Sequence, residues 1–466
     1  MNATTQPVSK PEQTSTLRRS LTRITISGCL AMVYITATSC PLFTDYFRAI
    51  GATGFHFGLL GGIPMVMVFM QFLGALLVNR LPRRKPLFMW LVIASRVVYL
   101  PIAFLPLLFP SIDKRQLLAT LIALVAVGSV LGNFATPLWM GWMADLIPTR
   151  VLNRYWGRRQ QAMYLAWTAA YLSISAYTYV FNLPIHIAYP ILVAIAVMAG
   201  VIDILLFLEV DEPPNKLVTD RVMLKVLFEP LQDPGYRRFV IFSCVWSACV
   251  MFTASFMQLY VLQELGLSQW ATTLIWCVAG VGLVVSSAAW GRIADRHGQR
   301  PILNLCVFFK PSIVLIFLLL TKDNVMWLLS VGFCLDSMLN AGNAVATNGY
   351  MMKIAPRANR PMFMAAIMGL SGLCGGLASI VGGMFLDMNK GFSLHLFGRE
   401  WTNFHLVFLI GFFLRVACMP LVRGIREPKS TPSREVLDEM LDSWYTMFVR
   451  RPAGLFRRIG DSGVED

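Results

Sequence analysis

Residues 291–301 read Gly-Arg-Ile-Ala-Asp-Arg-His-Gly-Gln-Arg-Pro, and they join two apolar stretches at residues 270–291 and 302–320. An apolar run of about 20 residues is long enough to cross the roughly 30 Å of hydrocarbon in a bilayer. Within the junction, Gly298 permits a tight turn, and the carboxylate of Asp295 can interact with the positive end of a neighbouring helix dipole. The pattern therefore predicts a short polar loop between two membrane-spanning helices.

Twelve apolar stretches of spanning length occur along the chain. They cover residues 24–47, 56–78, 86–109, 117–144, 160–182, 187–208, 237–262, 270–291, 302–320, 325–350, 361–386 and 403–422. The sequence is 56% hydrophobic and only 14% charged, with a mean hydropathy of +0.61. This composition leaves too little polar material to cover a water-soluble globule of 466 residues. We therefore expect an all-α membrane protein with twelve transmembrane helices.

Lysine and arginine are distributed unequally between the two sides of these spans. Of the 40 such residues, 31 lie on one side, counting Arg237 and Arg238 at the edge of the seventh span with the loop before it, 6 lie on the other side, and 3 lie deeper within the spans. Short loops rich in Lys and Arg stay in the cytoplasm, so we expect a cell-membrane protein with both termini cytoplasmic. The net charge of +15 is better matched by anionic lipid headgroups than by nucleic acid, because the basic residues lie beside the spans.

One long polar segment divides the twelve spans into two sets of six. The expected units are an N-terminal tail (1–23), a first bundle (24–208), a linker (209–236), a second bundle (237–422) and a C-terminal tail (423–466). Within the last unit, apolar residues from Val436 to Phe448 recur at helical spacing opposite acidic residues. This spacing predicts an amphipathic helix lying on the membrane, and a loosely ordered tail is the alternative.

The 291–301 loop resembles the cytoplasmic loop signature of the Major Facilitator Superfamily, Gly-x-x-x-Asp-Arg-x-Gly-x-Arg. The matching residues are Gly291, Asp295, Arg296, Gly298 and Arg300. A weaker copy between the second and third spans, residues 75–85, keeps Arg80 and Arg84 but has Asn79 in place of the aspartate. A simpler interpretation is that both loops are basic turns that only set the topology.

A second pair of segments also indicates an internal duplication. Residues 146–154, after the fourth span, parallel residues 354–360, after the tenth, and in both a proline ends the helix before basic residues. The resemblance implies two pseudo-symmetric six-helix bundles that enclose a substrate cavity and rock against each other.

The resemblance also implies a conformational latch at the cytoplasmic loops. It places Asp295 against the start of the fifth helix, where Arg158 and Arg159 are available, and Asn79 near Arg360 at the start of the eleventh. Asn79 keeps a hydrogen-bond acceptor but lacks the charge, so we expect the first-half contact to be the weaker one.

Five charged residues, Arg96, Asp203, Lys310, Asp336 and Arg415, fall well within the spans. Each costs about 2.5 to 3.5 kcal/mol at mid-bilayer and needs a partner or water. The resemblance puts helices 1, 4, 7 and 10 around the cavity, so only Asp336 is expected to face it. For Arg96 on helix 3, Asp45 is a possible partner at a different depth, whereas Asp203 and Arg415 are expected to snorkel or pair locally.

The tenth span carries Asp336, Asn340 and Asn343 at steps of four and three residues, which place them on one helix face. We expect this face to line the cavity, with Asp336 binding a solute group or carrying a proton (H+). The alternative is that Asp336 only neutralises Lys310 of the ninth span.

Further cavity candidates come from the first half. They are Tyr34 and Thr38 on the first span, Asn133 and Thr136 on the fourth, and Tyr164, Trp167 and Tyr171 on the fifth. Aromatic rings with polar tips suit an amphiphilic or sugar-like solute, although such a stripe also occurs in ordinary helix packing.

Sequence signals for other classes are absent. The chain has no phosphate-cradling Gly-Lys-Ser/Thr loop, no zinc-like histidine cluster and no nucleophile elbow. Its nine cysteines lie in apolar stretches without metal-ligand spacing. We therefore expect no catalytic residues, no metal site and no cofactor.

Taken together, these features predict a secondary active or facilitative transporter that moves a small organic solute by alternating access, as a monomer in the lipid bilayer. Two alternatives stay open: a transporter-like sensor or scaffold that moves nothing, and an efflux carrier for amphiphilic compounds. A membrane-embedded enzyme would need a clustered catalytic set, which the sequence does not show.

Overall fold

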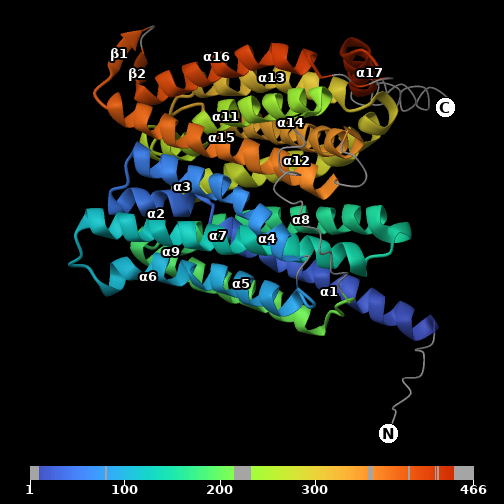
Figure 1. Ribbon diagram of the computed structural model, residues 1–466. Coiled ribbons are helices and arrows are strands. Elements are labelled where there is room, and N and C mark those ends of the chain that lie inside the picture. The colour runs from blue at the N-terminus through green and yellow to red at the C-terminus, as the bar shows by residue number, and fades with distance from the viewer. Residues whose placement is uncertain are drawn as a thin grey trace, which may run out of the picture.

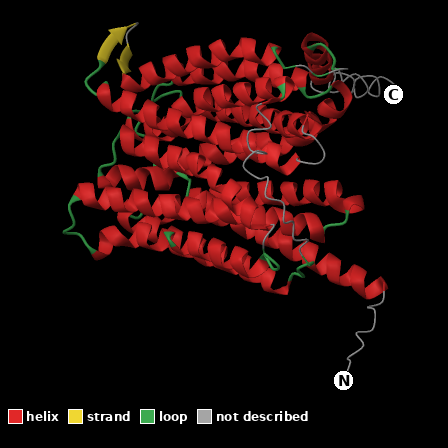
Figure 2. Ribbon diagram, in the orientation of Figure 1, coloured by secondary structure: helices red, strands yellow, loops and turns green. Residues whose placement is uncertain are grey.

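The computed structural model describes residues 10–78, 81–214, 232–354, 360–396, 399–425, 427 and 430–445. This part of the chain is almost entirely helical (Figure 2). Its only strands within those ranges, β1 (Ser393–Leu396) and β2 (Arg399–Thr402), pair antiparallel in a small hairpin.

The helices of residues 10–209, which we refer to as the first half, form six consecutive passes. They are α1 (Lys10–Ala37) with α2 (Pro41–Ile50); α3 (Gly54–Val66), η1 (Met67–Phe69) and α4 (Met70–Val78); α5 (Lys85–Val97) with α6 (Tyr99–Leu108); α7 (Lys114–Leu146); α8 (Thr149–Phe181); and α9 (Ile185–Leu205) with η2 (Leu206–Glu209).

The second half repeats the pattern with straighter helices. They are α11 (Pro234–Gln263), α12 (Gln269–His297), α13 (Arg300–Leu319), α14 (Val325–Ile354), α15 (Arg360–Met388) and α16 (Asn403–Arg423). A short further helix, α17 (Ser433–Tyr445), packs against α13, with Val436 only 1% exposed.

Eleven helical segments of the described residues are long and apolar enough to cross a membrane. Helix α8 is not among them, because polar and aromatic side chains interrupt its apolar sequence. It nevertheless has 33 residues and connects α7, which ends where the chain termini lie, to α9, which begins at the other end (Figure 1). The expected all-α membrane fold is confirmed, and the helices are consistent with twelve crossings.

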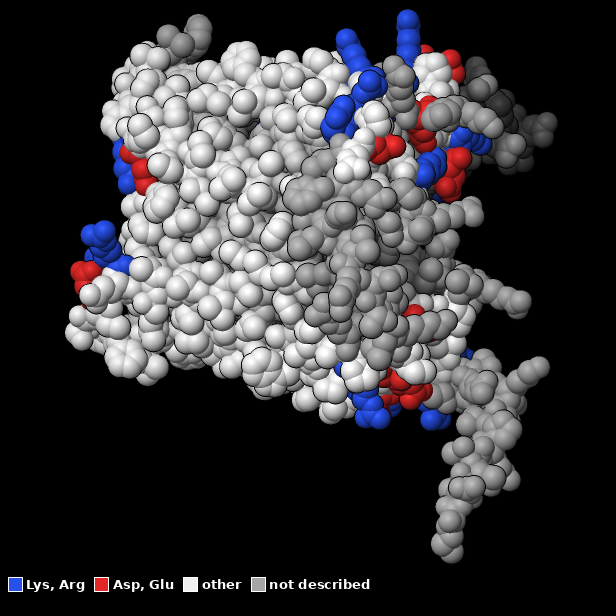
Figure 3. All heavy atoms as spheres, viewed as in Figure 1, with Lys and Arg blue, Asp and Glu red and all other residues white. Residues whose placement is uncertain are grey.

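On the face of the molecule shown in Figure 3, the charged side chains of the described residues lie at the two ends of the bundle, and a broad uncharged band separates them. We refer to the end at which both termini lie as the terminal end, and to the other as the opposite end. The apolar band matches the lipid-facing surface of a multi-pass membrane protein, since lipid replaces water as the solvent there.

The two halves use the same helix pairings. In the first half α1 packs against α8 and α9, while α7 packs against α4 and α5. In the second half α11 packs against α15 and α16, while α14 packs against α12 and α13. Counted along each half, these are the same positions, so the structure contains a twofold repeat.

The halves meet through α3 against α15 and through α8 against α12. Glycines allow the first pair to approach closely: a Cβ atom added at Gly58 would lie 2.7 Å from the carbonyl oxygen of Ser379, and one added at Gly62 would lie 2.5 Å from that of Gly376. This glycine seam lies toward the opposite end. On the terminal side of it, the second pass is broken at Pro64 and η1, so its remaining part, α4, can follow a different direction from α3.

Candidate functional site

The exposed side of α14 differs between the two parts of the helix. Toward the opposite end, its exposed residues are the apolar Trp327, Val331 and Leu335, which share one face. Toward the terminal end they are Asn340 and, one and two turns further, Ala344 and Asn348. The five-residue step from Leu335 to Asn340 turns the helix by about 140°. The exposed amides therefore do not face the lipid that the apolar residues face.

Helix α7 in the first half changes face in the same way. Val127 is 47% exposed in the part nearer the opposite end, no residue from 128 to 139 is exposed, and Met140 is 54% exposed. Thirteen residues separate the two, which places them on different sides of the helix. Together with α14, this indicates a space between the halves that opens at the terminal end.

Hydrogen bonds between the halves support this opening. Among the described residues, those that cross from one half to the other come from the middle and the opposite end of the helices. Thr44 donates to Gln258 Oε1 (2.7 Å), Ser175 donates to the carbonyl oxygen of Trp270 (2.8 Å), and Gln269 donates to Asp45 (2.5 Å). The structure is therefore closed at the opposite end.

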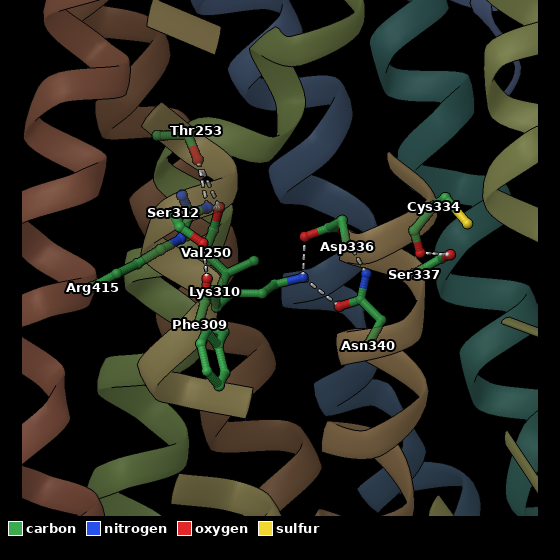
Figure 4. Close-up of polar contacts among 10 residues, drawn as sticks. All are labelled: Val250, Thr253, Phe309, Lys310, Ser312, Cys334, Asp336, Ser337, Asn340 and Arg415. Atoms are coloured by element: carbon green, nitrogen blue, oxygen red, sulfur yellow. Dashed lines mark hydrogen bonds and ion pairs between the residues drawn. The ribbon is translucent and has the colours of Figure 1, made fainter. Parts of the chain in front are cut away.

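At mid-depth, Lys310 reaches from α13 to the polar face of α14 (Figure 4). Its ammonium donates to Asp336 Oδ1 and to Asn340 Oδ1, both at 2.6 Å, and Asn340 Nδ2 donates to the second oxygen of Asp336 at 2.8 Å. The three side chains form a closed triangle. The side chain of Lys310 is 9% exposed and that of Asp336 is 23% exposed, so the carboxylate is the more accessible of the two charges.

The structure thus brings together Asp336 and Asn340, which the sequence placed on one face, and joins them to Lys310. Asn343, the third residue of that stripe, is half-buried, and its side-chain oxygen has no hydrogen-bond partner among the described residues. A carboxylate and amides can accept and donate to hydroxyl or amino groups of a solute. Their role in solute binding stays a prediction.

In the first half the cation at the matching position, Arg96, belongs to an ion pair that is buried. Arg96 of α5 forms an ion pair with Asp203 of α9, donates to the carbonyl oxygen of Gly200 and lies over the ring of Tyr34 at 5.0 Å. Asp203 is 0% exposed. Asp45 instead binds Arg48 and Gln269, so the partner of Arg96 is Asp203 and not Asp45.

The remaining first-half candidates make mainly local contacts. Asn133 accepts a hydrogen bond from Gln71 (3.0 Å), which follows the break in the second pass, and Thr136 and Thr38 donate to backbone carbonyls one turn earlier. Tyr34 donates to the carbonyl oxygen of Ser95 (3.4 Å). The Gln71–Asn133 hydrogen bond joins the second pass to the fourth, and only the fourth is expected to line a cavity.

The aromatic stripe of α8 is divided between two environments. Tyr164 and Trp167 are half-buried, whereas Tyr171 is only 2% exposed and packs against Trp167 and against Trp276 of α12. In this conformation Tyr171 therefore belongs to the contact between the halves.

No hydrogen bond or ion pair joins the expected latch residues in the described part of the chain. Asp295 and Arg158 are exposed, and neither makes a hydrogen bond or ion pair with the other half among the described residues. Arg159 is buried, and its guanidinium carbon lies 5.1 and 5.2 Å from the ring centres of Trp139 and Trp156, which also contact each other. Asn79 and Arg80 lie outside the described residues, as does the side chain of Arg360.

Both copies of the signature loop are held by a glutamate that sequence reasoning missed. Glu212, after the sixth pass, accepts hydrogen bonds from the backbone N–H groups of Arg84 and Lys85. Glu427, after the twelfth, accepts from those of Gln299 and Arg300, each at 2.8 Å. The two glutamates are 215 positions apart, as are the residues that they cap. The signal was a Glu-Pro pair just after each half.

Additional contacts fix these loops within their own halves. The side chain of Arg84 forms an ion pair with Asp145 at the end of α7 (2.8 Å). In the second half, Arg296 and His297 both contact Glu439 of α17, with His297 Nε2 at 2.8 Å from the carboxylate. The signature loop is therefore bound by the C-terminal helix while its aspartate remains free of the first half.

Arg415 of α16 is a buried cation with no carboxylate within ion-pair distance in the described part of the chain. It is 2% exposed, and it donates to Thr253 Oγ1 (2.7 Å) and to the carbonyl oxygen of Val250 (3.3 Å) on α11 (Figure 4). It packs between helices and gives no donor to the space between the halves. No group of three or more His, Cys, Asp or Glu side chains among the described residues could hold a metal ion.

The sequence profile of the Major Facilitator Superfamily matches residues 24–382 and 278–457. No curated protein sequence matches the chain significantly. Among solved structures, a mutant of the nucleoside transporter NupG is similar with a TM-score of 0.70 and 13% identity, over 88% of this chain and all of that chain.

Two other solved structures share the fold. The D-xylose-proton symporter has a TM-score of 0.62 and 16% identity, over 91% of this chain and 99% of that one. A bacterial homologue of the human lysosomal transporter Spinster, in an inward-facing and unoccupied conformation, has a TM-score of 0.56 and 15% identity, over 90% of this chain and 95% of that one.

Proposed function

The chain belongs to the Major Facilitator Superfamily, and on that premise we propose that it is a secondary active or facilitative carrier of a small organic solute that works by alternating access. The observation that carries this proposal is the change of exposed face on α14, from Trp327 and Leu335 to Asn340 and Asn348. Polar side chains at membrane depth are costly in lipid and are found where they line a water-filled path.

The present conformation, closed at the opposite end, would be one of the two states that such a carrier needs. If the terminal end is cytoplasmic, as the excess of Lys and Arg on that side predicts, this state is open to the cytoplasm. The other state would close the terminal end by bringing Asp295 to Arg158 or Arg159. A contact with Arg159 would require that side chain to leave its two indoles. A break in the second pass and a glycine seam at the opposite end are features that allow one half to rotate on the other.

The solute proposed is small, organic and polar, and the protein acts as a monomer in the cell membrane. Solved structures with a similar fold include a nucleoside transporter and a D-xylose-proton symporter, and these two names are consistent with a polar solute. Coupling to protons would be placed at Asp336, the most accessible carboxylate at mid-depth, but the Lys310 contact supports a purely electrostatic pairing equally well.

Reconstituted vesicles test this function directly. Purified protein in liposomes is given radiolabelled uridine, D-xylose and a panel of other polar organic solutes, with protein-free liposomes as the control. A carrier gives saturable uptake that accelerates when the same unlabelled solute is trapped inside. A sensor or scaffold that binds without moving its ligand gives a ligand-dependent rise in thermal stability and no counterflow.

A further inference from the structure

We propose that the Lys310–Asp336 pair sets the charge selectivity of the carrier, so that its solute is an uncharged, hydroxyl-bearing molecule and Lys310 is a specificity-determining residue. The inference rests on the proposed function. It assigns a role to Lys310, which lies on a helix outside the four that the family places around the cavity.

A solute beside the Lys310–Asp336 pair would meet no net charge from the two side chains. Lys310 and Asp336 are in direct contact at 2.6 Å, so their charges cancel over the distance of a solute molecule. The neighbouring exposed positions on α14, Asn340, Ala344 and Asn348, carry no charge. On α7, Met140 is likewise exposed and uncharged.

The other buried cations, Arg415, Arg159 and Arg96, do not add a charge to the space between the halves. Arg415 is 2% exposed and donates to α11, and Arg159 is 8% exposed and lies over the rings of two tryptophans, Trp139 and Trp156. Arg96 is neutralised by Asp203. Each is satisfied or enclosed within one half, so none of them offers an ion-pairing group to the space between the halves.

Asn340 and Asp336 keep hydrogen-bonding groups that their contacts with each other and with Lys310 do not use. Asn340 has used one amide N–H and its oxygen, and the remaining N–H belongs to an exposed side chain. Each oxygen of Asp336 accepts one bond within the triangle and can accept another. A carboxylate beside an amide donor is complementary to a hydroxyl group, which donates to the first and accepts from the second.

The arrangement differs from the buried Arg96–Asp203 pair of the first half in one respect. Asp203 is inaccessible, whereas Asp336 lies on a helix whose exposed face continues to the terminal end. Lys310 on α13 follows Arg96 on α5 by 214 positions, within one residue of the 215 positions that separate Glu212 from Glu427. The cation is therefore repeated, but only the second half directs its carboxylate toward the space.

The electrostatic potential near the Lys310–Asp336 pair can be measured with charged thiol reagents, before the solute is known. A cysteine is introduced at Ala344, about 12 Å along the helix from Asp336, in the full-length protein. Its reaction rates with methanethiosulfonates that carry a trimethylammonium or a sulfonate group are compared, each normalised to a free thiol. The unsubstituted protein controls for the native cysteines, and Leu335→Cys, on the lipid-facing side of the same helix, should react with neither reagent.

We expect Lys310→Met to raise the ratio of cationic to anionic rates and Asp336→Asn to lower it, each by at least about threefold, since a unit charge at this distance changes such rates by roughly twofold to fifteenfold. The double variant Lys310→Met/Asp336→Asn removes both charges and should return the ratio to that of the parent. This restoration also shows that the single variants did not simply misfold.

Two outcomes would overturn the inference. One is an equal ratio in all four backgrounds, and the other is a cysteine at position 344 that reacts with neither reagent. Both differ from a failure of the carrier function, which would leave the ratios as expected but give no counterflow in vesicles with any solute.

Discussion

The carboxylate of Asp387 lies 2.8 Å from the backbone nitrogen of Gly54, so a residue near the end of α15 caps the first turn of α3 in the other half. Its second oxygen accepts from the backbone N–H of Phe55, also at 2.8 Å. A carboxylate at a helix N-terminus satisfies free N–H groups and interacts favourably with the helix dipole. This contact closes the opposite end of the bundle.

Replacing Asp387 by Ala should weaken that closure by about 1 kcal/mol, the usual value of a lost cap, and so change the ratio of the two states about fivefold. Access of a water-soluble thiol reagent to a cysteine placed at Gln258 should increase. Lys390→Met, which removes only the exposed partner of Asp387, is the control. An unchanged labelling rate in Asp387→Ala would show that the cap does not govern the closure.

The glycine seam gives a second prediction. Gly62→Ala should disfavour the present state, because the added Cβ would lie 2.5 Å from the backbone oxygen of Gly376 and 3.0 Å from Ile380. Gly157→Ala on α8 is the matched control, since a Cβ there meets nothing within 4 Å. Spin labels at Ala144 and Ala344 measure the result, and the distance distribution should move to shorter values in Gly62→Ala only. A shift of equal size in Gly157→Ala would contradict the steric explanation.

The latch predicted from the signature loop concerns the state that is closed at the terminal end. Asp295 is exposed and makes no hydrogen bond or ion pair with the described residues of the first half, so Asp295→Ala should leave the present state intact and destabilise the state closed at the terminal end. Cysteines at that end should become more accessible in cells. Glu435→Ala, an exposed acidic change on α17, controls for the loss of a negative charge near the loop. If cytoplasmic accessibility does not change, Asp295 does not act as a latch.

Transport should depend on the Lys310–Asp336 pair as a unit. Asp336→Asn leaves the buried ammonium of Lys310 without its carboxylate, and Lys310→Met leaves the carboxylate of Asp336 without its ammonium. Each variant should reduce uptake at least about tenfold, because an unpaired buried charge is costly. The double variant should recover part of this loss. Uptake of the solute identified by counterflow, measured at pH 5.5 and 8, checks the result. Undiminished and pH-independent uptake by Asp336→Asn would remove any central role for that residue.

The sequence predicted the crossings well, because membrane thickness fixes how long an apolar helix must be. The expected span 403–422 is α16 (Asn403–Arg423), and 325–350 is α14 (Val325–Ile354). Helix α8 is longer than expected, since its polar first third extends beyond the apolar core. The break of the second pass at η1 was not predicted, although Pro64 marks it.

Partner choice was harder to predict, because it depends on how each helix is rotated. Sequence periodicity placed Asp336 with Asn340 on one face, and the structure adds Lys310 to them. The pairing of Arg96 with Asp203 could not be read from spacing, since 107 positions separate them. Glu212 and Glu427 were missed because they lie in loops, where no periodicity identifies a partner.

If the protein works by alternating access, the Lys310–Asp336–Asn340 centre is accessible from each side of the membrane in turn. Asn340→Cys in the full-length protein tests it, with a membrane-impermeant thiol reagent applied to intact cells and, separately, to inside-out vesicles. Alternating access predicts modification from both faces, while Leu335→Cys on the lipid-facing side resists the reagent from either. Modification of Asn340→Cys from one face only, under all solute conditions, would contradict the account.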